Sequence, residues 1–487
     1  MGRFLTVPSG YLNSPTRVHQ QTPPTTHLCD STFTMGFEVD KCIDLHNRIV
    51  AHACSHLPPD RQPQIQRSWF SAHSLDPSSP VPLPLDIEEE FDDDLTAFLS
   101  GIDIVVPEQH QHLAFNPLLV GVPSPNHMIP DMWLGIIEER EDYILLYTGP
   151  AYDAGGLLYS LSTQQVGYMA SPYSEPEDLY WDDLQNALEI YWDCVESGKF
   201  VIDAEYLGDE LTTQGWRILE WTGLELEGAL EAWHSLVDAI IKRLPVQGKD
   251  DDPGAHQEEK QEEVDAVLVS SEILEKYPAI PSFARAFLSR AKKPTFTSIA
   301  PQLDIPTEAF VHRVGAKLQE LHPDASITTP DCEMSYIPKF LLFPWRTQGL
   351  QLVLESDRDR WKDRRGHAHT LDNRAGLYLT PDGTHTHSIS LLLPFPVGAN
   401  GHVRKNNGTI VKPSDQGQDA LYRHGACTPF LPTHGTPLAA VLVNWCELVE
   451  KGNWHVDENG VAGEEDVWKQ ADTEDKAEDY MTDWSCF

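Results

Sequence analysis

The sequence predicts an α+β protein of two domains, each a small, mostly antiparallel sheet closed by amphipathic helices. Short runs of β-branched and aromatic residues alternate with Gly, Pro and Asp turns from about residue 115 to residue 169, which is typical of strands. Longer segments with apolar residues at helical spacing follow these runs. A charged stretch over 246–265 contains almost no apolar residues and separates two halves of the chain.

Changes in composition divide the chain into four parts. Residues 1–85 are rich in Pro, Thr and Ser, so we expect them to be largely disordered apart from one short amphipathic helix within Gly36–His56. We expect a first α+β domain over 86–245, an acidic linker over 246–265, and a second α+β domain with an acidic C-terminal tail over 266–487. A chain of 487 residues has room for two or three domains of ordinary size.

The first half is expected to form a meander followed by two helices. Four runs have the strand pattern, and they are MWLGIIEE, DYILLYTG, GGLLYSLST and QVGYM. Helices are predicted from Asp182 to Ser197 and from about Glu225 to Leu244, because apolar residues recur there at intervals of three and four.

The second half begins with helical segments and continues with strands. Helices are predicted for SSEILEKY, FARAFLSRA and PTEAFVHRVGAKLQEL, and again from Pro437 to Lys451. FLLFPW has the pattern of a strand, and RAGLYLTPDGTHTHSISLLLPF that of a hairpin with its turn at Pro381–Gly383. A tight turn at this place would pair Leu379 with His385.

One helix-to-strand unit occurs in both halves. LQNALEIYWDCVESGKFVID, which starts at Leu184, aligns with LAAVLVNWCELVEKGNWHVD, which starts at Leu438, at an offset of 254 residues. In both copies a glycine, Gly198 or Gly452, follows the helix at the position where a C-cap needs a positive φ. A duplicated unit explains this pattern, and so does chance, since many helices end in glycine.

Charge is the largest signal in the composition. The chain has 75 Asp and Glu residues against 35 Lys and Arg residues, which gives a formal net charge of -40. Such a surface repels phosphate backbones and anionic lipid headgroups, so we expect neither nucleic acid nor a membrane surface as a partner. It favours another protein with a basic surface, although solubility alone would also explain the charge.

Cysteine spacing and hydropathy indicate an intracellular, cytoplasmic protein. The eight cysteines form no CxxC pair and no dense framework, which is typical of reduced thiols. The first residues, MGRFLTVPSGYLNSPT, lack the apolar core of a signal peptide, and no run approaches the length of a membrane span. We therefore expect no stable membrane insertion, while the oligomeric state is left open.

The sequence contains none of the motifs that mark common active sites. We find no Walker loop, no strand-linked GxGxxG, no GxSxG elbow, and no kinase, zincin or deaminase signature. Carboxylates are too abundant for any pair to be chosen as acid and base. We therefore predict no catalytic residue and no cofactor, and the sequence favours a protein that is not an enzyme.

Two HxH pairs are the best indication of an enzyme. His367 with His369, and His385 with His387, could each present two imidazoles to a metal ion, because residues i and i+2 of a strand face the same side. Exposed strand histidines explain the same pattern without a metal. A metal-assisted enzyme built on this His-rich hairpin is therefore an alternative interpretation.

A segment of the first half resembles a known family. DYILLYTGPAYDAGGLLYSLSTQQVGYM, followed by WDDLQNALEIYWDCVESGK, has the strand, turn and closing-helix pattern of the SMI1/KNR4 or SUKH superfamily, and the resemblance covers Met132–Gly198. The run VLVNWCELVEKGNWHVDENGV is similar to the ends of uncharacterised proteins from filamentous fungi. The SUKH resemblance implies an acidic α+β binding module, of the kind that neutralises toxins in bacteria and serves cell-wall and stress signalling in fungi. It implies no catalytic residue.

Together these observations predict an acidic protein-interaction module, or a regulatory or accessory protein, without catalytic activity. The candidate binding residues lie in or beside the strand-and-turn region and are Trp133, Tyr147, Asp153 and Trp181. The alternatives are the metal-assisted enzyme and an accessory protein of a fungal biosynthetic pathway.

Overall fold

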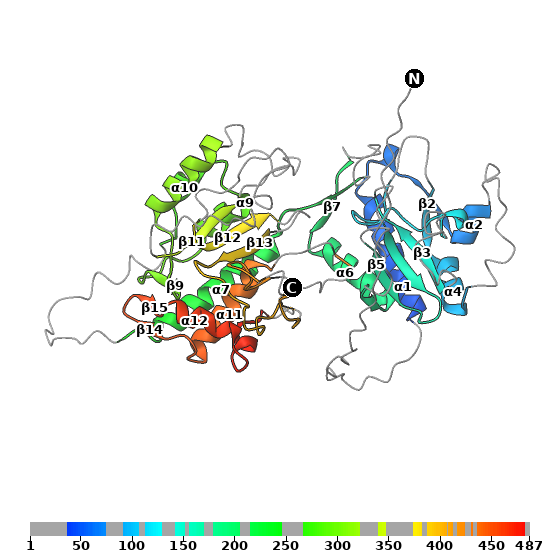
Figure 1. Ribbon diagram of the computed structural model, residues 1–487. Helices are drawn as coiled ribbons and strands as arrows, with labels where there is room; N and C mark the ends of the chain where they lie inside the picture. The colour runs from blue at the N-terminus through cyan, green and yellow to red at the C-terminus, as the bar shows by residue number, and fades with distance from the viewer. Residues whose placement is uncertain are drawn as a thin grey trace, which may run out of the picture. The chain divides into compact units, whose positions relative to one another are not determined.

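The computed structural model of the chain combines helices with several small, mostly antiparallel sheets, which confirms the α+β class (Figure 1). The residues that the structure describes are 37–74, 91–106, 113–128, 142–150, 155–169, 179–204, 215–245, 266–321, 339–346, 374–381, 387–406, 408–412, 416–423, 430–431 and 436–482. Within these ranges, no helix is long and apolar enough to cross a membrane.

The first sheet has four antiparallel strands in chain order. They are β3 (Tyr143–Thr148), β4 (Gly156–Ser160), β5 (Val166–Met169) and β6 (Trp181–Asp182). The meander predicted for DYILLYTG, GGLLYSLST and QVGYM is confirmed, since strands that are neighbours in sequence are also neighbours in the sheet. The expected strand MWLGIIEE lies outside the described residues.

Three helices share a hydrophobic core with this sheet. They are α1 (Val39–Ser55), α4 (Asp93–Gly101) and α6 (Leu184–Glu196). In α1, the apolar residues recur on one face, which is buried at Cys42, Leu45, Ile49, Val50 and Ala53. α4 begins where the Asp92 carboxylate accepts a hydrogen bond from the Leu95 backbone N–H at 2.7 Å.

The first core begins earlier in the chain than the composition indicates. α1, η1 (Pro59–Arg61), β1 (Gln64–Arg67) and α2 (Trp69–Ser74) all lie within 1–85. β1 pairs with β2 (Asp103–Val106), and the buried Trp69 indole N–H donates to the carbonyl oxygen of Pro123, just before α5 (Pro125–Met128), at 2.8 Å. Residues 37–74 are therefore folded and belong with the first core, although their Pro-rich surroundings suggest a linker.

A second hydrophobic core includes a three-stranded antiparallel sheet. Its strands are β11 (Phe340–Pro344), β12 (Gly376–Pro381) and β13 (His387–Leu392). The expected hairpin is present, but its expected register is wrong, because Leu379 pairs with Ile389 and Pro381 with His387. Residues 382–386 connect the two strands, and this connection is longer than the tight turn that would place His385 opposite Leu379.

Two long helices pack on this second sheet. α7 (Gly223–Ile241) contributes Trp233 and α11 (Leu438–Glu450) contributes Trp445. The Phe343 ring of β11 contacts both, with centroid distances of 5.6 Å to Trp233 and 6.1 Å to Trp445. The composition places α7 in the first domain, 86–245, whereas its buried face belongs to the second core.

The other elements of the second half include a small four-stranded sheet. Its order is β10 (Leu303–Asp304), β9 (Ser298–Ala300), β15 (Gly460–Val461) and β14 (Val456–Asp457), with β15 parallel to β9. The helices are α8 (Ser271–Glu275), α9 (Ser282–Leu288), α10 (Glu308–Leu321), α12 (Glu465–Lys469), η7 (Gln470–Asp472) and η8 (Ala477–Tyr480). The acidic stretch up to residue 482 is therefore folded and is not a loose tail.

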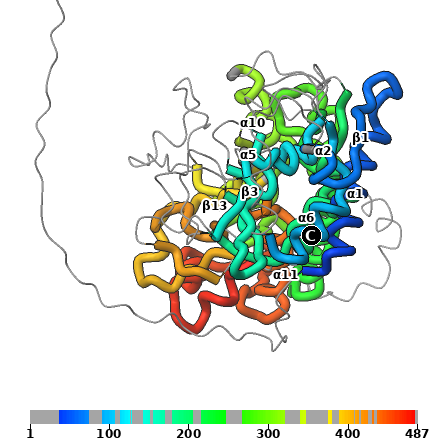
Figure 2. Tube along the Cα trace, turned by 90° about the vertical axis from the view of Figure 1, so that its right-hand side faces the viewer, coloured from blue at the N-terminus to red at the C-terminus, as the bar shows by residue number. Residues whose placement is uncertain are grey.

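The helix-to-strand unit has the same local structure in both halves. α6 and α11 each have 13 residues, and the following glycines, Gly198 and Gly452, have φ values of 72° and 74°. β7 (Phe200–Ile202) then pairs with β8 (Trp216–Ile218), as β14 pairs with β15. Figure 2 shows α1 beside α6, and α7 lies against α11 in the same way, so each half contains a pair of packed helices.

Candidate interaction surfaces

A β-bulge decides where the predicted binding residue Tyr147 lies. Along a regular strand, Tyr143, Leu145 and Tyr147 would share one face of the sheet. The register with β4 shifts between Leu145 and Tyr147, so Tyr147 instead packs in the first core and is fully buried. This placement corrects the expectation for Tyr147, because a ring without exposed surface does not contact a partner.

Tyr147 is hydrogen bonded to a buried histidine of α1. The His46 Nδ1 and Tyr147 hydroxyl oxygen atoms are 2.7 Å apart, and His46 Nε2 lies 3.0 Å from the Asp103 carbonyl oxygen. A carbonyl oxygen only accepts, so we assign the ring hydrogen to Nε2, and Nδ1 accepts from the tyrosine hydroxyl. The Phe115 ring stacks on the imidazole with centroids 4.7 Å apart.

Burial keeps this pair neutral. It lowers the pKa of His46 to about 4 and raises the pKa of Tyr147 well above its usual value. Both imidazole nitrogens are bonded within the protein, and neither side chain reaches the surface. The pair therefore joins α1 to β3 and does not have the exposure that an acid–base catalyst needs.

The predicted binding residue Trp181 lies on the opposite face of the first sheet. Its ring stacks on Tyr143, with centroids 5.5 Å apart and planes inclined by 24°, and both rings are partly exposed. Gly167 of β5 pairs with Trp181, and a Cβ at this glycine would lie 3.3 Å from the indole, so glycine lets the ring lie flat on the strand. The small buried cluster next to the two rings consists of Leu145, Leu158 and Met169.

The other predicted site residues are not described by the structure. Outside the described residues lie Trp133, Asp153, His367, His369 and His385. His387 begins β13, but its side chain is also outside the described part. The metal site on the His-rich hairpin therefore stays a prediction.

The described residues do not support metal or thiol chemistry. Among them, no group of three or more His, Cys, Asp or Glu side chains is placed to hold a metal ion. Burial raises the pKa of Cys42 and Cys194 to about 12 and that of Cys446 to about 11, and it also raises the pKa of Cys54. Thiols with such pKa values stay protonated and are poor nucleophiles.

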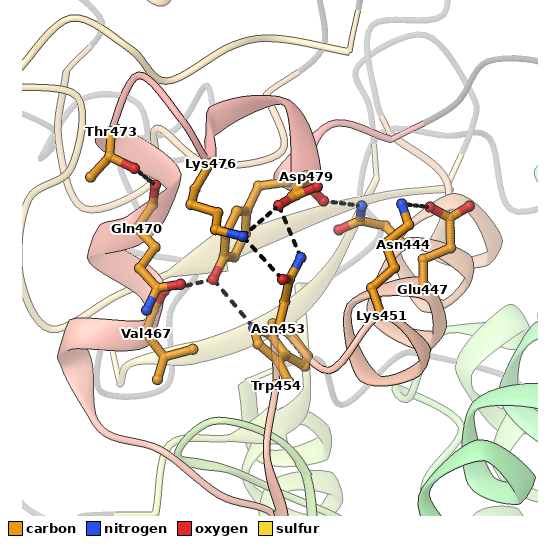
Figure 3. Close-up of polar contacts among 11 residues, drawn as sticks. Asn444, Glu447, Lys451, Asn453, Trp454, Val467, Gln470, Thr473, Lys476 and Asp479 are labelled. Carbon is orange, nitrogen blue, oxygen red and sulfur yellow. Dashed lines mark hydrogen bonds and ion pairs between the residues drawn. The ribbon is translucent and has the colours of Figure 1, made fainter.

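The C-terminal segment, residues 457–482, is bound to α11 by hydrogen bonds (Figure 3). The buried Asn444 amide of α11 donates to the carbonyl oxygens of Asp479 at 2.8 Å and Met481 at 2.9 Å. Its Oδ1 accepts from the Tyr422 hydroxyl at 2.9 Å. Both amide hydrogens and the amide oxygen are thus bonded, which offsets the cost of burying them.

Buried aromatic side chains also hold the C-terminal segment in place through hydrogen bonds. The Trp454 N–H donates to the Tyr480 hydroxyl at 3.3 Å, and that hydroxyl donates to the Val467 carbonyl oxygen at 2.6 Å. The Trp468 N–H donates to the Pro301 carbonyl oxygen at 2.8 Å. Because each aromatic side chain has both a buried ring and a bonded polar atom, the position of the segment is closely specified.

A buried carboxylate connects this segment to the loop at 398–402. Asp472 is 5% exposed and accepts through Oδ2 from the backbone N–H groups of Gly398 at 3.0 Å and Asn400 at 2.8 Å. Its Oδ1 accepts from the His402 N–H at 3.0 Å. Three charge-assisted hydrogen bonds compensate the burial of the charge, so Asp472 is a structural anchor.

The side chains that this scaffold leaves exposed are mostly acidic. The exposed acidic residues are Glu458, Glu464, Glu465, Asp466, Glu474, Asp475 and Glu478, and we call them the C-terminal acidic surface. The two lysines of the segment are already paired, Lys469 with Glu465 at 3.1 Å and Lys476 with Asp479 at 3.4 Å. The result is a negatively charged surface on a fixed backbone.

Composition alone did not reveal this surface, because an acidic end resembles a solvated tail. A signal was nevertheless present in the sequence. Trp468 and Ala471 are three residues apart, as are Ala477 and Tyr480, which suits short helical turns that bury one side.

Comparison of the chain with protein-family models, with curated proteins and with solved structures finds no match. The resemblance to the SUKH superfamily therefore stays a prediction. What the protein does has to follow from its own charge and contacts.

Proposed function

We propose that this protein is a cytoplasmic, non-catalytic interaction module that binds a basic protein partner through its acidic surface. The observation that carries the proposal is the C-terminal acidic surface, whose backbone is held by Asn444, Asp472 and Trp468. Carboxylates on a fixed backbone lose less conformational entropy when a partner binds. A solvated tail that serves only solubility needs no such anchors.

The negative charge of the protein determines which class of partner it attracts. Carboxylates in large excess attract Lys and Arg and accelerate association with a positively charged protein. The net charge of -40 repels nucleic acid and anionic membranes by the same field. The proposal agrees with the acidic binding role that the SUKH resemblance implies.

Salt-dependent capture tests the proposal. The immobilised full chain is incubated with a set of purified proteins whose isoelectric points range from acidic to basic. We expect it to retain the basic ones at low salt and to release them between about 0.1 and 0.5 M salt, where screening shortens the range of the charges.

A matched pair of triple variants locates the binding surface. The first replaces Glu464, Glu465 and Asp466 by Gln, Gln and Asn, and we expect it to weaken capture several-fold. The control replaces three exposed acids elsewhere by Gln, namely Glu231, Glu272 and Glu275. Capture that persists unchanged in high salt, or equal losses in both variants, would contradict the proposed surface.

A further inference from the structure

Two histidines at the end of α1 form a pair that the proposed function does not use. His52 lies in the last turn of the helix, and His56 is its C-cap residue with an αR backbone. Residues four apart on a helix lie on the same face, and the two ring centroids are 4.2 Å apart, with planes inclined by 34°. His52 is partly buried and His56 is exposed. We call these two residues the α1 histidine pair.

A hydrogen bond orients the imidazole of His56. Its Nδ1 lies 2.9 Å from the His52 carbonyl oxygen. A carbonyl oxygen only accepts, so Nδ1 carries the ring hydrogen of the neutral imidazole and the lone pair is on Nε2. Histidines that bind a metal ion commonly donate their other ring N–H to a backbone carbonyl, because this bond fixes the orientation of the ring. The His56 ring is therefore held as a metal ligand is held.

The other ring nitrogens of the pair are not used by the protein. In the described part of the chain, no hydrogen bond is formed by His56 Nε2 or by either ring nitrogen of His52. Neither nitrogen of His52 is among the buried side-chain atoms that lack a partner there, so both reach solvent. The rings of Trp192 and Trp216 lie beside the His52 ring, with centroids 6.2 and 6.3 Å away. Aromatic packing thus positions His52 and leaves its nitrogens available.

Two adjacent neutral imidazoles suit a divalent transition-metal ion. Imidazole is a preferred ligand of Zn²⁺, Ni²⁺ and Cu²⁺, whereas Ca²⁺ and Mg²⁺ prefer oxygen ligands. Two imidazoles that share a tetrahedral zinc ion, with Zn–N distances of about 2.0–2.1 Å, have ring centroids about 5 Å apart. The pair therefore needs only a small movement of the exposed His56 ring. The negative end of the helix dipole and the net charge of -40 also favour a cation there.

We propose that His52 and His56 bind one divalent transition-metal ion of the zinc class at the C-terminal end of α1, with water as its other ligands. Structural and catalytic zinc sites use three or four protein ligands, and no group of three is placed to hold a metal ion among the described residues. The α1 histidine pair is therefore an exchangeable binding site and not a reaction centre. An ion that bridges residues four apart fixes the last turn of α1. This inference is independent of the basic partner.

Isothermal titration calorimetry of the full chain with ZnCl₂, at about pH 7.5 where imidazole is neutral, tests the site. We expect His56→Gln to weaken the binding of one zinc ion per chain by at least about tenfold, because it removes a direct ligand. His52→Gln should have the same effect, since the chelate needs both rings. The control His455→Gln, at an exposed histidine of the second half, should leave zinc binding unchanged, and MgCl₂ should not compete for the site.

Tryptophan fluorescence locates the metal ion. Copper bound to the pair lies close to Trp192 and Trp216, so CuCl₂ should quench the emission of the wild-type chain and of His455→Gln more strongly than that of His56→Gln. Equal quenching in all three would show that copper binds elsewhere and would contradict the site.

Three other results would overturn the proposal. They are the absence of zinc binding by the wild-type chain, equal zinc affinity in wild type and His56→Gln, and loss of the zinc site in His385→Gln, which would place the metal ion on the predicted His-rich hairpin. His56 is exposed, so its variant still tests the pair if His52→Gln unfolds, which circular dichroism reports.

Discussion

The two helix-to-strand units differ in their hydrogen bonding at one equivalent buried position. Tyr191 of α6 and Trp445 of α11 correspond at the offset of 254 residues, and both are fully buried. The Trp445 N–H donates to the Tyr422 hydroxyl at 3.0 Å, whereas the Tyr191 hydroxyl has no hydrogen-bond partner in the part of the chain that the structure describes. The same helix geometry thus carries a satisfied polar network in one half and an unsatisfied group in the other.

The buried polar side chains of the two helix pairs also differ in kind. His46 of α1 can gain a proton, whereas Asn444 of α11 cannot. The comparison teaches that an equal helix length and the same glycine after the helix leave the chemistry of the core undetermined. It also indicates that the two halves will respond differently to mutation and to acid.

The largest effect is expected from Trp445. Its ring contacts Phe343, Trp454 and Trp468, so Trp445→Ala should lower the free energy of unfolding by about 3–5 kcal/mol. Urea unfolding followed by near-ultraviolet circular dichroism measures the change. Tyr191→Ala should cost less, because no hydrogen bond to its hydroxyl is seen among the described residues. An equal or larger cost at Tyr191 would show that ring burial, and not the polar network, dominates both units.

Acid should weaken the first half through His46. Below pH 6.5 the unfolded chain binds a proton at this residue, while the folded chain, with a pKa of about 4, does not. Stability therefore falls as the pH drops from 6.5 towards 4, and the loss reaches about 3 kcal/mol at the lower end. Above about pH 7 this contribution is absent, since both states are neutral there.

Urea midpoints between pH 7 and pH 4.5 measure this dependence. His46→Gln should lower stability at pH 7 but flatten the pH dependence relative to wild type. The exposed His455 provides the control, and His455→Gln should keep the wild-type slope. An unchanged slope in His46→Gln would assign the acid sensitivity to other groups.

The smallest effect is expected from deleting the hydroxyl of Tyr191. Tyr191→Phe should leave stability unchanged or raise it by up to about 1 kcal/mol, because no hydrogen bond to this buried hydroxyl is seen among the described residues. Tyr422→Phe should instead cost about 1–3 kcal/mol, since it leaves Asn444 and Trp445 atoms unpaired. Thermal unfolding distinguishes the two. A clear loss in Tyr191→Phe would reveal a partner for that hydroxyl.

Strong apolar periodicity made much of the fold predictable. α6, α7 and α11 begin and end within three residues of their expected limits, and β3, β4 and β5 follow their expected order. These elements follow from local spacing, because one face or one stripe of each must be buried.

Local spacing could not show which hydrophobic core each helix packs into. Proline-rich flanks made α1 look isolated, but its buried face packs into the first core. The charged linker after α7 made that helix look like the end of the first domain, but its buried face packs into the second core. The bulge in β3 is likewise invisible in a period of two, so the sequence did not show that Tyr147, a candidate binding residue, is buried in the first core. The Asn444 network was missed because Tyr422, Asn444 and Asp479 converge only after folding.

The pairing of Gly460 with Ser298 bears on how the protein is made. β15 lies between β9 and β14, so β9 lacks that neighbour until residues 460 and 461 have been synthesised. Most residues of the first core are synthesised by Trp216 and can collapse while translation continues. Until β15 is made, one edge of β9 lacks its neighbour, and an unpaired strand edge can pair with another chain.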